Sequence, residues 1–238
     1  MHVLIYPVEC HSWAKLLGDA RGPCKVVSDN TNPVVNWFLG EPKDVMLHLD
    51  LSESKQKKGG FKLAVLGSCT VLLVGTTNDV CTKQTYYVKE KVINEKGTFV
   101  ERLFNIPHDG RRQFQNLTME IACLVWARVL LEIIYQIKIL GQPQFPIPRF
   151  HFVEAALAIE QLSDEHGKET GRVFLLEEVI QKNEEGKFRK YLNNVSPVPL
   201  PMDNNEDAEC AQFLAFSQHV QYFKTKKLVF VSDYQGNI

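Results

Sequence analysis

The sequence predicts an α+β fold, and three observations carry this prediction. Short β-branched or aromatic runs separated by Gly and Asn-Asp turns fill residues 44–106, which is typical of an antiparallel sheet. Apolar residues then recur with the helical period from Leu117 to Ile137. The elements follow as strands, helix, strands, helix and strand, which differs from the repeated strand–helix units of a parallel sheet.

The elements can be justified in chain order. Residues 1–40 show no clean period, so residues 1–43 are predicted as an N-terminal extension or edge element and residues 44–238 as the folded domain. The extended runs 44–51, 59–67, 69–75, 79–88 and 97–106 are expected to form the sheet. Asn116 is expected to cap the long helix, and Gly141 with Pro143 to end it.

The second half of the chain adds shorter elements. Runs 151–162 and 172–180 are expected to be strands around a polar hairpin loop at 161–171, although the alanine and glutamate content of 151–162 also permits a helix. The acidic, proline-bearing stretch 197–209 is expected to be a solvated loop, followed by a helix over 210–223. A last strand, Leu228–Val231, is expected to deliver Asp233 and Gln235 at its end.

Composition excludes several classes of protein. The 238 residues carry a formal net charge of -1, which gives no electrostatic case for nucleic acid or an anionic membrane as the main partner. The most apolar segment, 121–140, contains two arginine or lysine residues, a glutamate and a glutamine, which argues against a membrane span. No basic leader precedes the first apolar run, and the six cysteines lack paired spacing. An intracellular, cytoplasmic protein with reduced thiols is therefore expected.

Two features of the predicted sheet could bind phosphate. The Gly59-Gly60 turn could bring backbone N–H groups close to a phosphate with Lys62 nearby, although Gly-Gly between strands also serves as a plain hairpin. Lys83 lies inside an otherwise apolar strand, where a lysine is costly to bury without a partner. It could hold nucleotide phosphates, or its stem could cover apolar surface at a sheet edge.

Two further features carry carboxylates. Glu120, near the start of the predicted helix, could simply complement the helix dipole, or could form an ion pair that aims Lys83 at phosphates. Asp233 and Gln235 offer oxygen ligands suited to Mg²⁺, or could belong to an ordinary turn after a strand.

Taken together, these segments resemble the alpha-kinase family of atypical protein kinases, from about residue 55 to the end of the chain. The most specific part is FLAFSQHVQYFKTKKLVFVSDYQG, which is similar to the family's A-F-S-H segment and D-x-Q-G strand, in the form of its fungal members. RVFLLEEVIQKNEEGKFRKYLNN resembles the hinge strand and the G-x-F-x-K-Y-x-N-N segment. NLTMEIACLVWA, GGFKLA and VCTKQ stand where the family has its partner helix, phosphate loop and nucleotide lysine.

The resemblance implies a protein-kinase-like fold, with an antiparallel-sheet N-terminal lobe, one long helix and a C-terminal lobe. It implies transfer of the γ-phosphate of ATP to a serine or threonine hydroxyl of a protein substrate, with Mg²⁺ as cofactor. The ATP-binding residues would be Gly59, Gly60, Lys62, Lys83, Glu120 and Glu177. Lys83 would contact the phosphates, Glu120 would pair with it, and Glu177 would hold the adenosine at the hinge.

For the C-terminal part, the resemblance makes Asp233 the catalytic aspartate, beside Lys83 in the catalytic set, and makes Asp233 and Gln235 ligands of Mg²⁺. His219 stands at the position of a zinc ligand, although a histidine packed on or capping a helix is the favoured interpretation.

The family continues beyond this strand with another metal-binding aspartate, a glycine-rich substrate loop and further zinc ligands, whereas the chain ends at Ile238. An incomplete C-terminal lobe is therefore expected, with exposed apolar surface within 210–231 and with zinc only in a longer form. Two alternatives stay open: an inactive nucleotide-binding or partner-binding pseudokinase fragment, and a structural domain with decayed kinase-like segments.

Overall fold

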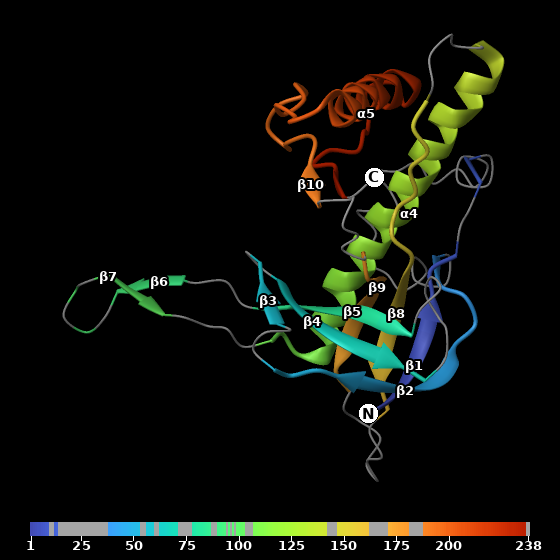
Figure 1. Cartoon of the computed structure of the whole chain (residues 1–238). Coiled ribbons are helices and arrows are strands. Elements are labelled where there is room, and N and C mark those ends of the chain that lie inside the picture. The colour runs from blue at the N-terminus through green and yellow to red at the C-terminus, as the bar shows by residue number, and fades with distance from the viewer. Residues whose placement is uncertain are drawn as a thin grey trace. The chain divides into compact units, whose positions relative to one another are not determined.

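The computed structural model (Figure 1) describes residues 1–9, 12–13, 38–52, 56–59, 62–70, 78–86, 90–93, 95, 97, 99–102, 107–141, 147–161, 171–180 and 188–236. The chain divides into two compact units. Unit 1 comprises Met1–Glu9, Val35–Ile121 and Val153–Val179, and unit 2 comprises Cys10–Val34, Ala122–Phe152 and Ile180–Ile238. The two are described in turn.

Unit 1 is built on a seven-stranded sheet in the order β2-β1-β8-β9-β5-β4-β3, with every pairing antiparallel. Its strands are β1 (His2–Pro7), β2 (Lys43–Leu49), β3 (Gln56–Lys58), β4 (Lys62–Cys69), β5 (Asp79–Thr85), β8 (Ala155–Glu160) and β9 (Val173–Glu178). Strand β2 also pairs with β4, so six strands close into a ring and β3 attaches to β4 outside it. Closure leaves those six strands without a free edge along the paired residues.

The core of unit 1 follows from alternation along these strands. Each of the six strands of the ring supplies buried apolar side chains from one face, because successive residues point to opposite faces of a sheet, and β8 and β9 bury residues on both faces. Ala156 and Ala158 of β8, for example, pack with Phe174 and Leu176 of β9. The remaining members of this cluster are Val3, Ile5, Val45, Leu47, Cys69 and Val80.

Gly67 allows the ring to close. A Cβ atom at this position would lie 2.5 Å from the backbone oxygen of His48 on β2, closer than real Cβ atoms approach. Residue 67 is paired with Leu49 in the β2–β4 register, so the contact lies on the closing edge. Glycine is the residue that permits so close an approach of two backbones.

The N-terminal residues depart from expectation. The irregular sequence at 1–40 predicted an extension or an edge element, yet His2–Pro7 forms β1, an inner strand between β2 and β8. The run HVLIYP is short and ends in proline, so its period was too brief to detect. The predicted boundary between residues 43 and 44 meets the start of β2, but β1 belongs to the same sheet.

Most other predicted strands of unit 1 are confirmed. Runs 44–51, 59–67, 79–88, 151–162 and 172–180 contain β2, β4, β5, β8 and β9. Run 97–106 contains β7 (Phe99–Arg102), which forms a hairpin with β6 (Glu90–Ile93). Residues 71–75 of the predicted strand 69–75 lie outside the described residues, as does most of the predicted loop at 161–171.

The long helix α4 (Gly110–Gly141) ends where predicted but begins six residues before the expected cap. Asp109 is the residue whose carboxylate accepts the backbone N–H of Arg112, at 2.9 Å, so Asp109 caps the helix and Asn116 lies within it. The apolar period that starts at Leu117 concealed the earlier turns, because the first residues, GRRQFQN, are mostly polar. Residues to Ile121 belong to unit 1 and later ones to unit 2.

Unit 2 contains α5 (Asn205–Lys224) and the short pair β10 (Arg189–Lys190) and β11 (Gln235–Gly236). Helix α5 begins inside the stretch predicted as a loop, because Asn204 caps it by accepting the N–H of Asp207 at 2.8 Å. The core of this unit consists of Tyr191, Leu192, Cys210, Ala211, Leu214 and Tyr234.

The strand predicted at Leu228–Val231 is not formed. The backbone of Val231 bonds instead to two glutamine side chains of α5: its N–H donates to Gln221 at 2.9 Å, and its carbonyl accepts from Gln218 at 2.8 Å. These amides take the places that a neighbouring strand would fill. The expected exposure of apolar surface within 210–231 is confirmed, since Phe216, Tyr222, Phe223, Leu228 and Phe230 are exposed.

Within the described ranges, no helix combines the length and the apolar character that crossing a membrane requires.

Candidate functional site

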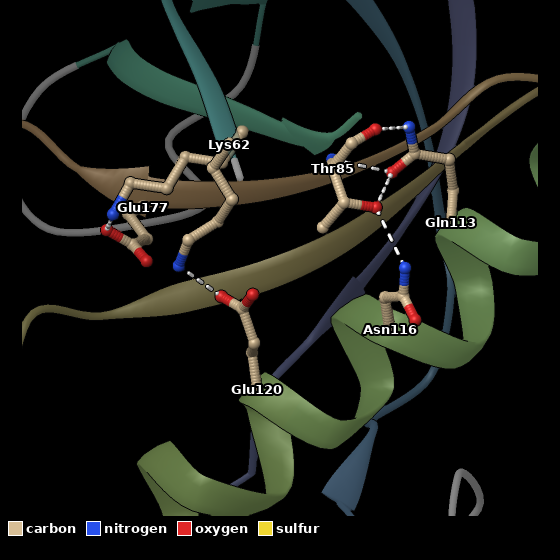
Figure 2. A network of polar contacts seen from close by, with 7 residues as sticks. Lys62, Thr85, Gln113, Asn116, Glu120 and Glu177 are labelled. Atoms are coloured by element: carbon tan, nitrogen blue, oxygen red, sulfur yellow. Dashed lines mark hydrogen bonds and ion pairs between the residues drawn. The ribbon is translucent and has the colours of Figure 1, made fainter. Parts of the chain in front are cut away.

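Polar side chains of unit 1 gather where the first turns of α4 meet the ends of β4 and β5. Lys62 opens β4, and its Nζ lies 2.7 Å from Oε2 of Glu120 on α4. Both side chains are about three-quarters buried, at 27% and 25% exposed. Figure 2 shows Glu120 reaching up from the helix to the end of the Lys62 side chain. The pair fixes the helix against the sheet and neutralises two groups that would be costly to bury alone.

A second ion pair joins neighbouring strands. Lys83 of β5 binds Glu177 of β9 through Nζ and Oε2, and these side chains are also largely buried. The register pairs Cys81 with Glu177 and Lys83 with Leu175, so the ion pair runs diagonally across two strands. Lysine and glutamate are long enough to span such a diagonal.

The ion pair expected between Lys83 and Glu120 is therefore corrected. Glu120 binds Lys62, and Lys83 binds Glu177. Glu120 lies in the third turn of α4 rather than at its start, so its predicted interaction with the helix dipole is also weakened. Helix α4 supplies the carboxylate that binds Lys62, and strand β9 supplies the carboxylate that binds Lys83.

The two ion pairs lie on one face of the sheet. Directly paired residues of antiparallel strands present their side chains to the same face. Lys62 pairs with Thr85, and Thr85 shares the alternation of Lys83 and Cys81 on β5. Glu177 pairs with Cys81 and joins the same face. Two ammonium groups and a carboxylate from three adjacent strands are thus displayed together, opposite the face that fills the core.

The charged groups of this face influence the pKa of the Cys81 thiol. Burial raises the pKa of its thiol, the Lys83 ammonium opposes that rise, and the Glu177 carboxylate adds to it. The thiol is accordingly held in its neutral form at pH 7. Cys81 therefore contributes a small, uncharged side chain between the charged groups.

Amide side chains extend the polar face along α4. Gln113 contacts Thr85 at three points: Oε1 accepts the Thr85 N–H at 2.9 Å and its hydroxyl at 3.0 Å, while Nε2 donates to the Thr85 carbonyl at 2.6 Å. Asn116 adds a bond from Nδ2 to the Thr85 hydroxyl at 3.1 Å. Figure 2 shows both amides pointing from the helix to the same strand end. Sequence reasoning missed both, although their spacing from Glu120, seven and four residues, places all three on one helical face.

The backbone N–H and carbonyl of Gly59 form hydrogen bonds within the sheet. The N–H of Gly59 donates to the carbonyl of Lys62 at 2.8 Å, and the hydroxyl of Tyr86 donates to the carbonyl of Gly59. A Cβ at residue 59 would meet only an ordinary contact at 3.5 Å, so sterics alone do not require glycine there. Gly60 lies outside the described residues. The plain hairpin interpretation thus accounts for the contacts of Gly59.

In unit 2, Asp233 and Gln235 lie at the end of the described chain, beside β10. Lys190 pairs with Gln235 in the β10–β11 register, and its Nζ lies 2.5 Å from Oδ1 of Asp233. Asp233 has a φ of 60°, a left-handed conformation that favours glycine, asparagine and aspartate. Gln235 is exposed, whereas Tyr234 between them is buried in the core.

Lys190 is a third site residue that the sequence reasoning did not single out. The signal was available, because Lys190 is the lysine of the G-x-F-x-K-Y-x-N-N segment. His219 is exposed on α5. Within the described part of the chain, no three His, Cys, Asp or Glu side chains converge on a point that could hold a metal.

Comparison with known proteins decides the family. The sequence model of the alpha-kinase family matches residues 57–238, which include every candidate site residue named above. The chain belongs to the alpha-kinase family.

This alpha-kinase chain also resembles a solved structure, the inactive alpha-kinase domain of myosin-II heavy chain kinase A complexed with ATP. The identity is 11% and the TM-score 0.49, over 99% of this chain and 77% of the other. No curated protein matches the alpha-kinase chain.

Proposed function

We propose that the chain is an ATP-dependent protein kinase of the alpha type, which transfers the γ-phosphate of ATP to a serine or threonine hydroxyl of a protein. The observation that carries this proposal is the family match over residues 57–238. We assign unit 1 to the sheet-rich N-terminal lobe and unit 2 to the C-terminal lobe. We place the activity in the cytoplasm, where thiols such as the four free cysteines of the described residues stay reduced and ATP is available.

In unit 1, the proposal rests on the face that carries the two ion pairs. Lys83 would bind the phosphates of ATP, and Lys62 would add a second positive charge. Both are paired with and oriented by carboxylates, which lowers the cost of their burial before nucleotide arrives. Glu177 would hold the adenosine at the hinge, and its bond to Lys83 would then link adenosine and phosphate recognition.

In unit 2, the proposal rests on Asp233 and Gln235. Asp233 would act beside the substrate hydroxyl, and both residues would bind Mg²⁺. The residues fit a hard cation: the Asp233 carboxylate already takes the Lys190 ammonium as a counter-ion, and the Gln235 side chain is exposed. Mg²⁺ commonly uses one or two protein oxygens and completes its shell with water and nucleotide phosphates. When bound, it would neutralise charge on the phosphates, the main demand of phosphoryl transfer.

Lys190 would orient Asp233. An ammonium 2.5 Å from Oδ1 leaves the other carboxylate oxygen for the substrate hydroxyl or the cation. The left-handed backbone at residue 233 brings the carboxylate to this lysine instead of continuing an extended strand. Phosphoryl transfer depends on such positioning more than on covalent chemistry by the protein.

The second candidate function is a non-catalytic nucleotide-binding or partner-binding domain. The observation that favours it is the pairing of Asp233 with Lys190, which occupies the carboxylate that transfer would need. In this candidate the lysines of unit 1 would still bind nucleotide, but no phosphate would be transferred to a substrate.

The experiment that tests the proposal measures the melting temperature with and without Mg-ATP. We expect Mg-ATP to raise it, Lys83→Ala to abolish the shift, and Lys224→Ala, at an exposed lysine of α5, to preserve it. No shift in the parent protein would contradict both candidates. Transfer of radiolabelled phosphate to a basic peptide or to the protein itself then separates the kinase from the binding domain.

A further inference from the structure

Gln113 is among the most completely buried polar side chains of unit 1, at 1% exposed. A buried amide is costly unless each of its donors and acceptors is satisfied. Its three bonds all go to one residue, Thr85, and two of them go to the Thr85 backbone. A side chain that meets both the N–H and the carbonyl of one residue makes the two bonds that a neighbouring β-strand would make.

The position of Thr85 explains why such a partner is needed. The pairing of β5 with β9 runs from Val80 to Lys83 and stops two residues before Thr85. On the other side, β4 pairs with β5 as far as Lys62 and Thr85. Beyond Lys83, residues 107–108 continue on the β9 side of β5: Tyr86 pairs with Pro107, and the His108 N–H donates to the Thr85 carbonyl at 3.1 Å. Gln113 shares that carbonyl and supplies the acceptor for the Thr85 N–H, and the fixed point it creates is the cross-strand partner of Lys62.

The same helical face carries this fixed point to Glu120. Gln113, Asn116 and Glu120 follow each other by three and four residues, the spacing of side chains stacked along one face of a helix. Figure 2 shows the three side chains directed from α4 towards the strands. Because the amides of Gln113 and Asn116 both hold Thr85, they set how far α4 is advanced along the sheet. That setting places the Glu120 carboxylate at Lys62.

We propose that Gln113 is a positioning residue of the nucleotide site: its bonds to Thr85 fix the register of α4, so that Glu120 holds the Lys62 ammonium in place for nucleotide phosphates. This inference rests on the proposed function. An amide suits Thr85 better than a carboxylate, because the amide oxygen accepts from the Thr85 donors while its NH₂ group donates to the Thr85 carbonyl beside the His108 N–H. Lys83 is independent of this device, since its carboxylate comes from β9.

The test is a double-mutant cycle read as the dissociation constant for Mg-ATP, measured by calorimetry. Gln113→Leu removes the amide at similar volume, and Glu120→Gln removes the charge through which it acts. We expect Gln113→Leu to weaken Mg-ATP binding about tenfold in the parent, and less than about twofold when Glu120→Gln is already present. Gln136→Leu, which removes an exposed amide from the same helix, is the matched control and should leave binding unchanged.

Equal weakening of Mg-ATP binding in both backgrounds would show a general structural role and overturn the inference. So would the absence of any weakening by Gln113→Leu. Gln113→Asn, which keeps the amide but shortens its reach, provides a milder variant if Gln113→Leu fails to fold. It should weaken binding in the parent background only.

A second readout does not depend on nucleotide binding. Brief acetylation followed by mass spectrometry measures the reactivity of each lysine amine. We expect Gln113→Leu or Gln113→Asn to raise the reactivity of Lys62 several-fold and to leave that of Lys83 unchanged, because only Lys62 depends on Glu120. Unchanged Lys62 reactivity would overturn the inference even where Mg-ATP binds. Increased Lys62 reactivity in a protein that does not bind Mg-ATP would overturn the proposed function, but it would support the role of Gln113 in fixing the register of α4.

Discussion

Neutralising the four charged side chains of the two ion pairs, singly and in pairs, tests which carboxylate serves which lysine. Lys62→Met and Lys83→Met remove the ammonium groups and keep most of the apolar stem. Glu120→Gln and Glu177→Gln remove the negative charges at constant size. Four double-mutant cycles then give a coupling free energy for each lysine–glutamate combination.

The expected magnitude follows from burial. Exposed ion pairs contribute about 0.2–1 kcal/mol, and breaking a fully buried pair costs about 3–5 kcal/mol. The four side chains here are between 17% and 27% exposed, so each observed pair falls between these limits. We expect a coupling of about 1–2 kcal/mol for Lys62 with Glu120 and for Lys83 with Glu177, and about zero for the two crossed combinations.

The assay is urea unfolding at low ionic strength, with the midpoint and slope fitted for every variant. The coupling should fall at high salt, but less than for a surface pair, because partly buried charges are screened less. A larger coupling between Lys83 and Glu120 than between either observed pair would refute the assignment. It would favour the partner that the family resemblance implied.

Three other changes test different parts of the structure. Gly67→Ala should lower the free energy of unfolding by about 1–3 kcal/mol, because the added Cβ would meet a backbone oxygen of β2 at 2.5 Å. Gly59→Ala is the control and should be close to neutral. Equal effects of the two substitutions in urea unfolding would contradict ring closure through residue 67. Asp233→Ala should cost about 1 kcal/mol more stability than Asp233→Asn, since alanine is strained at a φ of 60°, and equal midpoints would argue against the left-handed backbone. Burial raises the pKa of Cys69 to about 11 and that of Tyr234 to about 12, so the folded state prefers their neutral forms. Their contribution to stability is complete below the unfolded-state pKa values of 9.0 and 10.0 and is lost as pH rises towards the folded-state pKa values of about 11 and 12. The urea midpoint should therefore fall between about pH 8 and pH 10.5. The fall should be smaller in Cys69→Ala than in the parent protein.

The sheet could be predicted from the sequence because its strands bury one face. Runs such as RVFLLEEVI alternate or are continuously apolar over the length of a strand, and β9 lies within that run. Strand β1 escaped prediction because its apolar residues sit in a short run before a proline, and its pairing with β8 is remote in sequence. Periodicity reports burial, but it does not report which distant segment supplies the neighbour.

The site was predictable in its residue types and less so in its contacts. Lys83 could be singled out because a charge inside an apolar run is expensive, and Glu177 through the family resemblance, yet their mutual bond depends on the β5–β9 register. Because Asp109 caps α4, the helix begins earlier than predicted, and Glu120 lies in its third turn rather than its first. From there Glu120 binds Lys62. Gln113 was missed because a polar residue near a helix start is usually solvated, and its spacing from Glu120 indicates only a shared helical face.

The closed ring has a consequence for how the domain is delimited. Similarity to the family begins at residue 57, after β1 and β2, yet β2 is the strand that joins β1 to β4. A protein trimmed to the matched residues would expose the backbone of β8 on one side and of β4 on the other, together with the apolar side chains that β1 and β2 cover. Aggregation through two unpaired strand edges is the expected outcome. The unit recognised by sequence similarity is therefore smaller than the unit that folds.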